Sequence, residues 1–589
     1  MTSTYALKKI SGVYDSSVSA LTAASFTPLV ALSRFSVCAL LTRLQVGQLE
    51  IIDSDGSSRV YGDLTLRAKA ALNADAAGGT VAGADLLAEA ASSVAEAVKK
   101  VASPTPESEA DSEGEAGSSA STSDSTLLSK TATPSAAQDA ASSSAKVDSA
   151  PAAGPPRAVL KVINDAFWIR MFVGVDMGFA EAFMAGEVET PDLGACFALF
   201  IHNRAALSNL NTGLFATLSS KAQALLNRQY ANTRSGSLKN IGAHYDISNQ
   251  MYEAFLSRDM TYSCGVFPTL DADILPSSQK STAAFLGGLV NDPEAAAKLD
   301  SLPSSVAKTE NEYATDDLED SQIRKLRMHI TRANIQPGHR VLEIGTGWGS
   351  FAMEAARLTG CTVDSLTLSV EQKALAEARI ARAGLSDRIT VHLLDYRDMP
   401  QSWSDSFDRV VSIEMLEAVG NEFLETYFSA VSRVLKRRGG VAVFQCITIP
   451  EDRFEVYKDE VDFIKKYIFP GGCLLSVTRL FEAARTASKG TLIPEGLTNI
   501  GPHYARTLRE WCTRFEASFD EHVAPALIRD HPEIRKLSKE GQAKEVEVFR
   551  KKWIYYFVYC EVGFTERVIG DHILTFVREG NTSYPAVCA

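Results

Sequence analysis

The chain has 589 residues, of which 45% are hydrophobic and 22% charged, and its formal net charge is -13. Single hydrophobic cores stop growing near roughly 250 to 300 residues, so this length predicts at least two folded units. The composition is that of a globular protein. A nucleic-acid partner is not expected, because phosphate binding needs a basic field over much of the surface.

The nine cysteines are scattered along the chain, without a Cys-x-x-Cys pair or a zinc-type spacing. This pattern predicts no metal site and favours a reducing, cytoplasmic compartment. The most apolar N-terminal stretch, residues 18–41, is interrupted by Pro28 and Arg34. It is therefore not expected to span a membrane.

The N-terminal third predicts one small domain with an interruption. Residues 40–63 alternate apolar and polar side chains around Asp55-Gly56, which predicts a hairpin. Residues 73–156 are dominated by Ala, Ser, Gly, Pro, Asp and Glu, so they lack the apolar side chains that offset the entropy of ordering, and we expect a disordered acidic insert. We predict an N-terminal domain formed by residues 1–72 and 157–230.

From residue 323 onward, strand-like runs alternate with helical ones. Strands are expected at residues 340–344, 361–366, 389–394, 409–413 and 441–446, and helices at residues 507–518 and 545–564. This rhythm is typical of an α/β fold in which crossover helices join a parallel sheet. Residues 231–589 are expected to form this second domain, with a loop insertion at about 269–319.

A glycine-rich loop follows the first of these strands, in the run Val341-Leu-Glu-Ile-Gly-Thr-Gly-Trp-Gly349. Glycines let the backbone turn sharply and approach a ligand, and the amino end of the next helix favours negative charge. By themselves, Gly345, Gly347 and Gly349 fit a tight turn as well as a cofactor site. Their spacing differs from that of dinucleotide-binding loops, and Glu343 precedes them, where an acid lies near the cationic end of a methyl donor.

The next two strand ends carry further polar residues. We expect Gln372 and the backbone of Thr367 and Leu368 to bind the donor ribose, Asp395 to accept from the adenine amino group, and Tyr396 to stack on the ring. Individually, each has a plainer interpretation, such as a helix cap or a solvated side chain. Together, at successive strand ends, they favour a pocket for S-adenosyl-L-methionine.

Several further blocks of sequence match one family in order and cover most of residues 240–575. They are His244-Tyr-Asp-Ile-Ser-Asn249, Met260-Thr-Tyr-Ser-Cys264, the glycine loop, Thr367-Leu-Ser369 with Glu371-Gln372, Ser412-Ile-Glu-Met-Leu-Glu417, Tyr467-Ile-Phe-Pro-Gly-Gly472 and Asn499-Ile-Gly-Pro-His-Tyr504. In these blocks the chain resembles the cyclopropane fatty acid synthases and mycolic acid cyclopropane synthases. The variant Phe444-Gln-Cys-Ile-Thr-Ile449, followed by Asp462-Phe-Ile-Lys-Lys-Tyr467, most resembles their plant and actinobacterial branches. A weaker match, at residues 178–186, resembles the lipid-binding domain of long family members.

The resemblance implies a fold and a donor. The fold is that of a class I S-adenosylmethionine-dependent methyltransferase, with a Rossmann-like, mostly parallel seven-stranded sheet and a smaller N-terminal lipid-binding α+β domain. It also implies that Tyr262 and Ser263 contact the donor.

The resemblance further implies the reaction, which is transfer of the donor's methyl carbon to the cis double bond of an unsaturated phospholipid acyl chain. An alkene is a poor nucleophile, so positioning must supply much of the rate. Closing a cyclopropane ring then requires a base, which in this family is thought to be bound bicarbonate. Carried over to this chain, the bicarbonate cradle is formed by Cys264, Glu417, Ile447 and Tyr504, with Gln445 where bacterial relatives have His. A Gln donates hydrogen bonds but cannot carry a proton.

Two features of the C-terminal region have alternative interpretations. Cys560 matches a cysteine once proposed as the family nucleophile, but methyl transfer to an alkene needs no covalent cysteine, so we favour packing for it. The aromatic run at residues 553–559 either lines an acyl tunnel or forms a helical core stripe.

Three other functions remain open. C-methylation without ring closure would give a methyl-branched or methylene chain, N-methylation of a small amine uses the same scaffold, and an inactive domain would leave a lipid-binding protein. The expected partners are membrane phospholipids with unsaturated chains, reached by peripheral association through local patches such as residues 550–552. The sequence leaves open whether the chain is a monomer or a homodimer.

Overall fold

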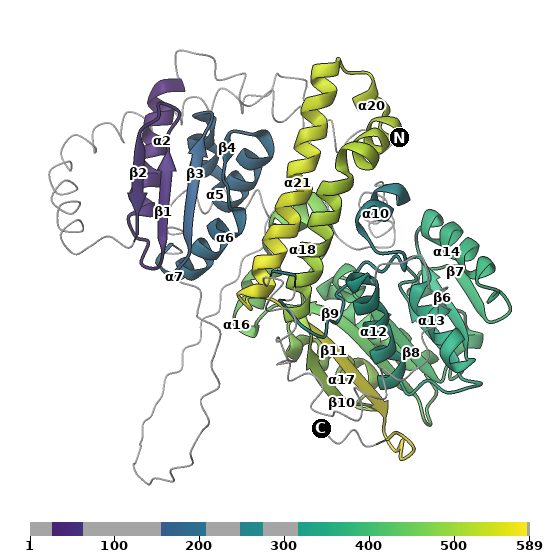
Figure 1. Cartoon of the computed structure of the whole chain (residues 1–589). Helices are drawn as coiled ribbons and strands as arrows, with labels where there is room; N and C mark the ends of the chain where they lie inside the picture. Colours follow the sequence, from purple (N-terminus) through teal and green to yellow (C-terminus); the bar gives the residue numbers. More distant parts are fainter. Residues whose placement is uncertain (1–25, 63–154, 208–247, 272, 275–315, 586–589) are drawn as a thin grey trace, which may run out of the picture. The chain divides into compact units, whose positions relative to one another are not determined.

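The computed structural model describes residues 26–62, 155–207, 248–271, 273–274 and 316–585 (Figure 1). The predicted acidic insert at 73–156 lies almost wholly outside these residues. The predicted loop insertion at 269–319 lies largely outside them. Among the described helices, none combines the length and the apolar character that crossing a membrane requires.

The N-terminal part contains a four-stranded sheet of order β2-β1-β3-β4. Its elements are α2 (Phe26–Leu41), β1 (Gln48–Ile52), β2 (Ser58–Tyr61), β3 (Arg157–Val162), α5 (Ala166–Ala185), β4 (Val188–Glu189), α6 (Leu193–His202) and α7 (Arg204–Leu207). The predicted hairpin is confirmed, since β1 and β2 pair antiparallel across a turn in which Gly56 has φ +82°. On its other side β1 pairs parallel with β3, although about a hundred residues separate these strands.

The C-terminal part is built on a seven-stranded sheet of order β10-β11-β9-β8-β5-β6-β7. Its strands are β5 (Arg340–Ile344), β6 (Thr362–Thr367), β7 (Ile389–Leu393), β8 (Arg409–Ile413), β9 (Val441–Thr448), β10 (Leu492–Asn499) and β11 (Gly570–Arg578). The expected strands are confirmed, two of them at the expected bounds. Strands β10 and β11 were not predicted, and β11 runs antiparallel to both of its neighbours.

Alternation along the strands gives this sheet two apolar faces, because successive side chains point to opposite sides. Val341, Val411 and Val443 belong to one core cluster, together with residues of α12 (Asp317–Arg332), α13 (Ser350–Thr359) and α14 (Val370–Arg382). Leu342 and Phe444 belong to the other cluster, with residues of α15 (Leu424–Val434) and α17 (Val477–Ser488). The result is a three-layer sandwich of helices, sheet and helices.

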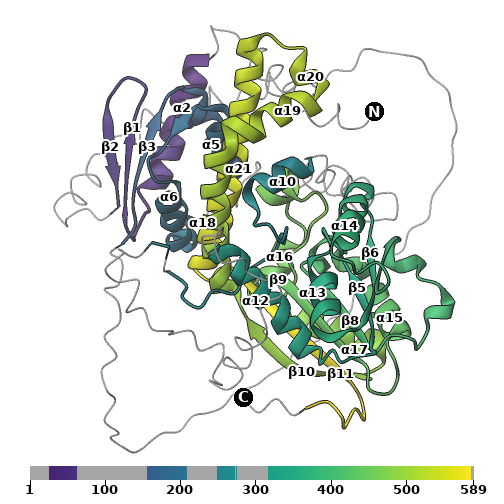
Figure 2. The same ribbon diagram turned by 45° about the vertical axis from the view of Figure 1, so that its right-hand side comes forward.

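Six further α-helices belong to the described residues of the C-terminal part. These are α10 (Asn249–Phe255), α16 (Glu451–Tyr457), α18 (Gly501–Ser518), α19 (Ala524–Asp530), α20 (Pro532–Arg535) and α21 (Lys539–Thr565). Helices α18 and α21 lie side by side in both views (Figures 1 and 2). The predicted helices at 507–518 and 545–564 are confirmed as parts of this pair, each extended at its amino end.

One side of α21 faces the N-terminal helices α5 and α6. Tyr555 is buried among aromatic rings, with its centroid 5.0 Å from that of Phe197 and 4.5 Å from that of Phe463. The carboxylate of Glu181, on α5, accepts hydrogen bonds of 2.7 Å from both Lys466 Nζ and the Tyr467 hydroxyl. The N-terminal and C-terminal parts therefore share an aromatic core with an ion pair beside it.

Candidate active site

The glycine loop connects β5 to α13 at the carboxyl end of the parallel strands, where ligands bind in open α/β sheets. Gly345 has φ +105°, and a side chain there would bring a Cβ to 3.3 Å from the Cβ of Met415. The amides of Gly345 and Thr346 both donate to the Leu366 carbonyl at 3.0 Å, which fixes the loop against β6. Gly347 borders open space, since a Cβ added to it would have no neighbouring atom within 4 Å.

Glu343 lies at the base of this loop with 4% of its surface exposed. Its carboxyl group accepts a hydrogen bond from the Ser365 hydroxyl. Burial raises the pKa of Glu343 to about 8. A buried acid of this kind favours a nearby cation, since the cation offsets the cost of ionising the carboxyl group.

The end of β6 places the expected ribose partners together. The Thr367 hydroxyl donates to Gln372 Oε1 at 2.9 Å, and Ser369 caps α14 by accepting from the Gln372 amide at 3.1 Å. Gln372 is buried and Leu368 is half-buried. Because the Thr367 hydroxyl occupies Gln372 Oε1, the side-chain amide nitrogen of Gln372 is the group that can donate to a ligand.

At the end of β7, Asp395 has structural partners of its own. It caps a short 3₁₀ turn by accepting from the Arg397 amide at 2.9 Å, and it also accepts 2.8 Å and 2.5 Å hydrogen bonds from the Arg397 guanidinium. Tyr396 is half-buried, with its ring 5.0 Å from that of Tyr427. The adenine contacts of Asp395 and Tyr396 stay predictions, and Asp395 would have to make its contact while paired with Arg397.

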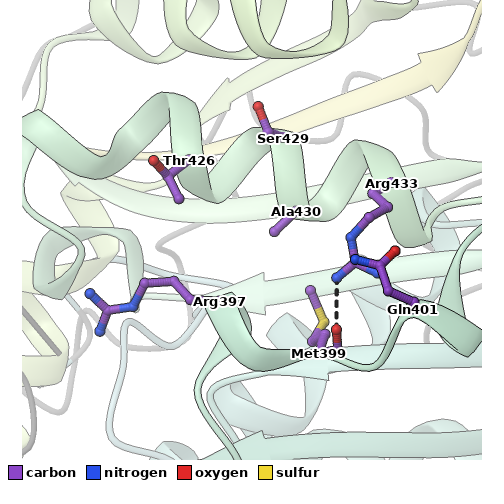
Figure 3. A pocket seen from close by; sticks show the side chains of 7 residues that line it. All are labelled: Arg397, Met399, Gln401, Thr426, Ser429, Ala430 and Arg433. Atoms are coloured by element: carbon purple, nitrogen blue, oxygen red, sulfur yellow. Dashed lines mark hydrogen bonds between the residues drawn. The ribbon is translucent and has the colours of Figure 1, made fainter.

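A surface pocket of about 370 Å³ lies close to this strand end (Figure 3). It is lined by Arg397, Met399, Gln401, Thr426, Ser429, Ala430 and Arg433. Arg433 closes one side of it by donating to the Met399 carbonyl at 3.0 Å. None of the predicted site residues lines this pocket, so we do not assign it to the donor.

Tyr262 and Ser263 come from the segment that follows α10. The Tyr262 hydroxyl lies 3.0 Å from that of Tyr556, on α21. Ser263 is buried, and its hydroxyl accepts a hydrogen bond of 2.5 Å from Lys325 Nζ. Lys325 is fully buried on α12, and burial lowers its pKa while Glu414 and Asp259 raise it. Sequence reasoning did not identify this cation.

Three of the predicted cradle residues meet at Glu414, which directly follows β8. The Cys264 amide and the Gln445 side-chain amide donate to Glu414 Oε1 at 2.8 Å and 2.7 Å. The Tyr504 hydroxyl donates to Glu414 Oε2 at 2.6 Å. Burial raises the pKa of Glu414, although the Cys264 amide and the Tyr504 hydroxyl lower it.

Gln445 also donates to Asp571 Oδ2, at 2.7 Å, so its amide bridges two carboxyl groups. Both Gln445 and Asp571 are fully buried. Burial raises the pKa of Asp571 well above its ordinary range, and the neighbouring Glu414 raises it further. Glu414 and Asp571 are therefore two neighbouring acids that share the Gln445 amide as a donor.

The other two cradle residues pair with each other. The Ile447 amide donates to Glu417 Oε1 at 2.5 Å, while Glu417 Oε2 is buried without a hydrogen-bond partner. Burial, followed by the neighbouring Glu414, raises the pKa of Glu417 to about 8. An unpartnered buried oxygen is costly, so it marks a place where a ligand or water would bind.

Cys560 lies apart from this cluster, half-buried on α21. Burial raises the pKa of the Cys560 thiol well above its ordinary value, so the nucleophilic thiolate is disfavoured. Its surroundings are those of a packing residue.

The structure thus adds Glu414, Asp571 and Lys325 to the residues named from sequence. Glu414 lies within one of the matching sequence blocks, but the family resemblance assigned the cradle role to Glu417 of the same block. Asp571 belongs to β11, a strand that was not predicted. For Lys325, the only signal in the sequence was a lysine on the apolar face of an amphipathic helix.

The sheet order, the glycine loop and the acid before it define an S-adenosylmethionine-dependent methyltransferase. The donor fits the residues present, because a side chain at Gly345 would be strained and would crowd Met415, Gly347 borders open space and Glu343 favours a cation. Residues 232–289 and 304–572 match the family model described as mycolic acid cyclopropane synthetase, and the chain belongs to this family.

Relatives of known name extend the match beyond the catalytic part. The chain is 32% identical to tuberculostearic acid methyltransferase UfaA1 of Mycobacterium tuberculosis over 434 residues, which is 73% of this chain and 86% of the relative. It is 30% identical to cyclopropane-fatty-acyl-phospholipid synthase of Escherichia coli over 368 residues, or 62% and 79% of the two chains. The solved structure of mycolic acid cyclopropane synthase CmaA1 with SAH and CTAB aligns at a TM-score of 0.42 and 23% identity, covering 58% of this chain and 97% of that one.

Proposed function

We propose that the chain transfers the methyl carbon of S-adenosylmethionine to the cis double bond of an unsaturated phospholipid acyl chain and closes a cyclopropane ring. The observation that carries the proposal is the group of acids next to the donor loop, formed by Glu414, Glu417 and Asp571. Ring closure needs a proton acceptor at the reacting carbon, and a site with one buried and two half-buried carboxyl groups can provide one. The names of the two relatives above, which refer to a fatty acid and to a fatty-acyl phospholipid, support the class of substrate.

When bound, S-adenosylmethionine supplies an electrophilic methyl group on a positively charged sulfur. The chain's own residues would hold it, with Glu343 near the cationic part and Gln372 near the ribose. Aromatic residues such as Tyr262 and Tyr556 border the site and can stabilise positive charge on the acyl chain through their ring faces. Bicarbonate, the base implied by the family resemblance, stays a prediction, and it would compete with Glu414 for Cys264 and Tyr504.

One specific observation favours a second candidate, C-methylation without ring closure. The relative that shares the larger part of this chain is named for tuberculostearic acid rather than for a cyclopropane product. Gln445 fits this candidate as well, since it cannot relay a proton. Both candidates begin with the same methyl transfer and differ only in the step that follows.

The test is to incubate the full chain with S-adenosylmethionine and vesicles of dioleoyl phosphatidylcholine, and to analyse the lipids by mass spectrometry and proton NMR. Cyclopropanation is expected to give the far-upfield ring methylene signals, which a methyl-branched or methylene chain lacks. Vesicles of a saturated phosphatidylcholine are the control and should give no product. Product from a small amine, but none from oleoyl vesicles, would favour N-methylation and contradict the proposal.

Sedimentation of the same vesicles tests the proposed peripheral membrane association. We expect the chain to bind vesicles without needing anionic lipid, because its net charge of -13 opposes attraction to a negative surface. Binding that appears only with anionic lipid would contradict this expectation.

A further inference from the structure

We propose that Glu414 is the catalytic base of this enzyme and takes the place of a bound anion in the cradle. The inference rests on the proposed function and identifies the group that accepts the proton in its last step. Glu414 was not among the cradle residues expected from sequence. Its role follows from what the surrounding groups contact in the structure.

The cradle is filled by the chain itself. A bound anion would need hydrogen-bond donors, and the donors at hand are the Cys264 amide, the Tyr504 hydroxyl and the Gln445 amide. All three donate to the carboxyl group of Glu414, at 2.8 Å, 2.6 Å and 2.7 Å. The remaining amide, that of Ile447, donates to Glu417. Glu414 therefore has the set of partners expected for the anion.

The surroundings of Glu414 also support its negatively charged state. Ionising a carboxyl group away from water is costly unless donors satisfy it, and Glu414 has three from the chain, one of them a main-chain amide that cannot be titrated away. Gln445 supports this state, because its amide nitrogen donates to Glu414 and Asp571 at once and cannot compete for the proton. A histidine at this position could hold the proton itself, whereas Gln445 leaves it to the acids.

The backbone conformation of Glu414 determines where its carboxyl group lies. Glu414 has φ +45°, a left-handed backbone conformation that is uncommon for residues other than glycine. Such strain persists only where the surroundings enforce it, often at functional sites. The next residue, Met415, lies against Gly345 of the donor loop. The bend thus lies at the end of β8, next to the residue that contacts the glycine loop.

The proposed step balances in atoms and charge. The alkene's π electrons form a bond to the methyl carbon, the carbon–sulfur bond breaks with its electrons going to sulfur, and the acyl chain becomes a carbocation. The Glu414 carboxylate then removes a proton from the new methyl group, and the released C–H electron pair forms the second ring bond. One positive charge enters with the donor and one proton leaves to water after the product departs, so Glu414 returns to its starting state.

The test compares wild-type protein with Glu414→Gln, Glu414→Gly and the matched control Glu482→Gln, whose residue lies on α17, away from the acid cluster. Each protein is assayed on dioleoyl phosphatidylcholine vesicles in buffer purged of carbon dioxide and in buffer with added bicarbonate. The donor carries a trideuterated methyl group. A cyclopropane ring keeps two of the three deuterons, whereas a product that lost its proton from the acyl chain keeps all three.

Wild-type protein and Glu482→Gln are expected to form the ring equally well with and without bicarbonate. Glu414→Gln should form the ring at least about 100-fold more slowly, the usual loss for a general base, while binding S-adenosylhomocysteine as wild type does in calorimetry. Products that keep three deuterons would then appear. Recovery of Glu414→Gly by added bicarbonate would support the proposal, since the anion would refill the vacated cradle.

Wild-type protein that forms the ring only when bicarbonate is present would overturn the role of Glu414, and this measurement needs no variant. Ring formation by Glu414→Gln at the wild-type rate would overturn it as well. These results differ from failure of the proposed function, in which wild-type protein makes no methylated lipid under either condition, and which would overturn both.

Discussion

Among single residues, Glu343 should couple donor binding to pH. Its pKa is raised to about 8 by burial, so without donor it is largely protonated at neutral pH. A cation nearby lowers that pKa, which means that donor binding releases a proton and strengthens as pH rises toward about 8. Calorimetry of S-adenosylmethionine binding between about pH 6 and pH 8.5, in buffers of different ionisation enthalpy, measures this release.

The variant Glu343→Gln is the control for this prediction. It keeps a hydrogen-bond partner for Ser365 but cannot titrate, so binding should be weaker and nearly independent of pH over the same range. A wild-type affinity that does not change with pH would contradict the predicted linkage.

Gly345 is the position at which a single added methyl group should weaken donor binding. The substitution Gly345→Ala imposes a side chain at φ +105° and 3.3 Å from the Cβ of Met415, so the loop must move. We expect the dissociation constant for S-adenosylhomocysteine to rise at least about tenfold, which corresponds to about 1.4 kcal/mol. The matched control is Gly338→Ala, which has φ +79° in an exposed turn with no atom within 4 Å of the added Cβ. Equal affinity in the two variants would contradict the role of the loop.

The sequence located the strand-end residues well and the contacts between them less well. Gly345, Thr367 and Gln372 could be named because each lies at or just after the end of a strand whose apolar run is readable. The partners of Asp395 and Glu414 could not, because they depend on local turns. At Asp395 a 3₁₀ turn brings Arg397 back onto the carboxylate, and at Glu414 a positive φ redirects the side chain toward Tyr504.

Among the elements, helix α21 joins the N-terminal helices to the catalytic part, and Tyr555 is its central contact. The variant Tyr555→Ala would leave a cavity among Phe179, Phe197 and Phe463, so we expect the free energy of unfolding to fall by about 3 to 5 kcal/mol. Chemical denaturation monitored by tryptophan fluorescence measures the change. The control Tyr555→Phe keeps the ring and should cost about 1 kcal/mol or less. A stability of Tyr555→Ala equal to wild type would show that this contact is not part of the core.

Element prediction failed at β10 and β11 for a physical reason. Strand β10 contains Pro494 and Gly496, residues that usually mark turns, and its pairing with β11 has an irregularity between them. Strand β11 pairs antiparallel with β9, which lies more than a hundred residues earlier. Local patterns cannot show such a partner, and Asp571 was missed together with its strand.

At the scale of the whole molecule, the order of the strands shows how segments that are remote in sequence form common sheets. The parallel pairing of β1 with β3 and the shared ladder of the seven-stranded sheet both join segments that are remote in sequence. The length of the chain predicted that more than one folded unit exists, and the alternation of strands and helices predicted the larger one. The contacts of α21 with α5 and α6 were not predictable, because aromatic residues at helical spacing do not specify their partners.

The N-terminal sheet also sets the chain's tolerance to changes of length. Tyr61, at the end of β2, lies opposite Leu49, and Arg157, at the start of β3, lies opposite the adjacent residue Gln48. Strands are spaced about 4.8 Å apart, so the two ends of the intervening segment are only about 10 Å from each other. A linker of about six glycine and serine residues reaches about 20 Å and would bridge them.

A shortened chain in which such a linker replaces residues 64–154 should therefore melt within a few degrees of the full chain and methylate lipid at a similar rate. Calorimetric melting and the vesicle assay check this, and a shortened chain that does not fold would contradict it. The same geometry makes the connection between β2 and β3 a suitable insertion site. A fluorescent reporter protein could be placed there, within the sequence, while both ends of the chain stay free.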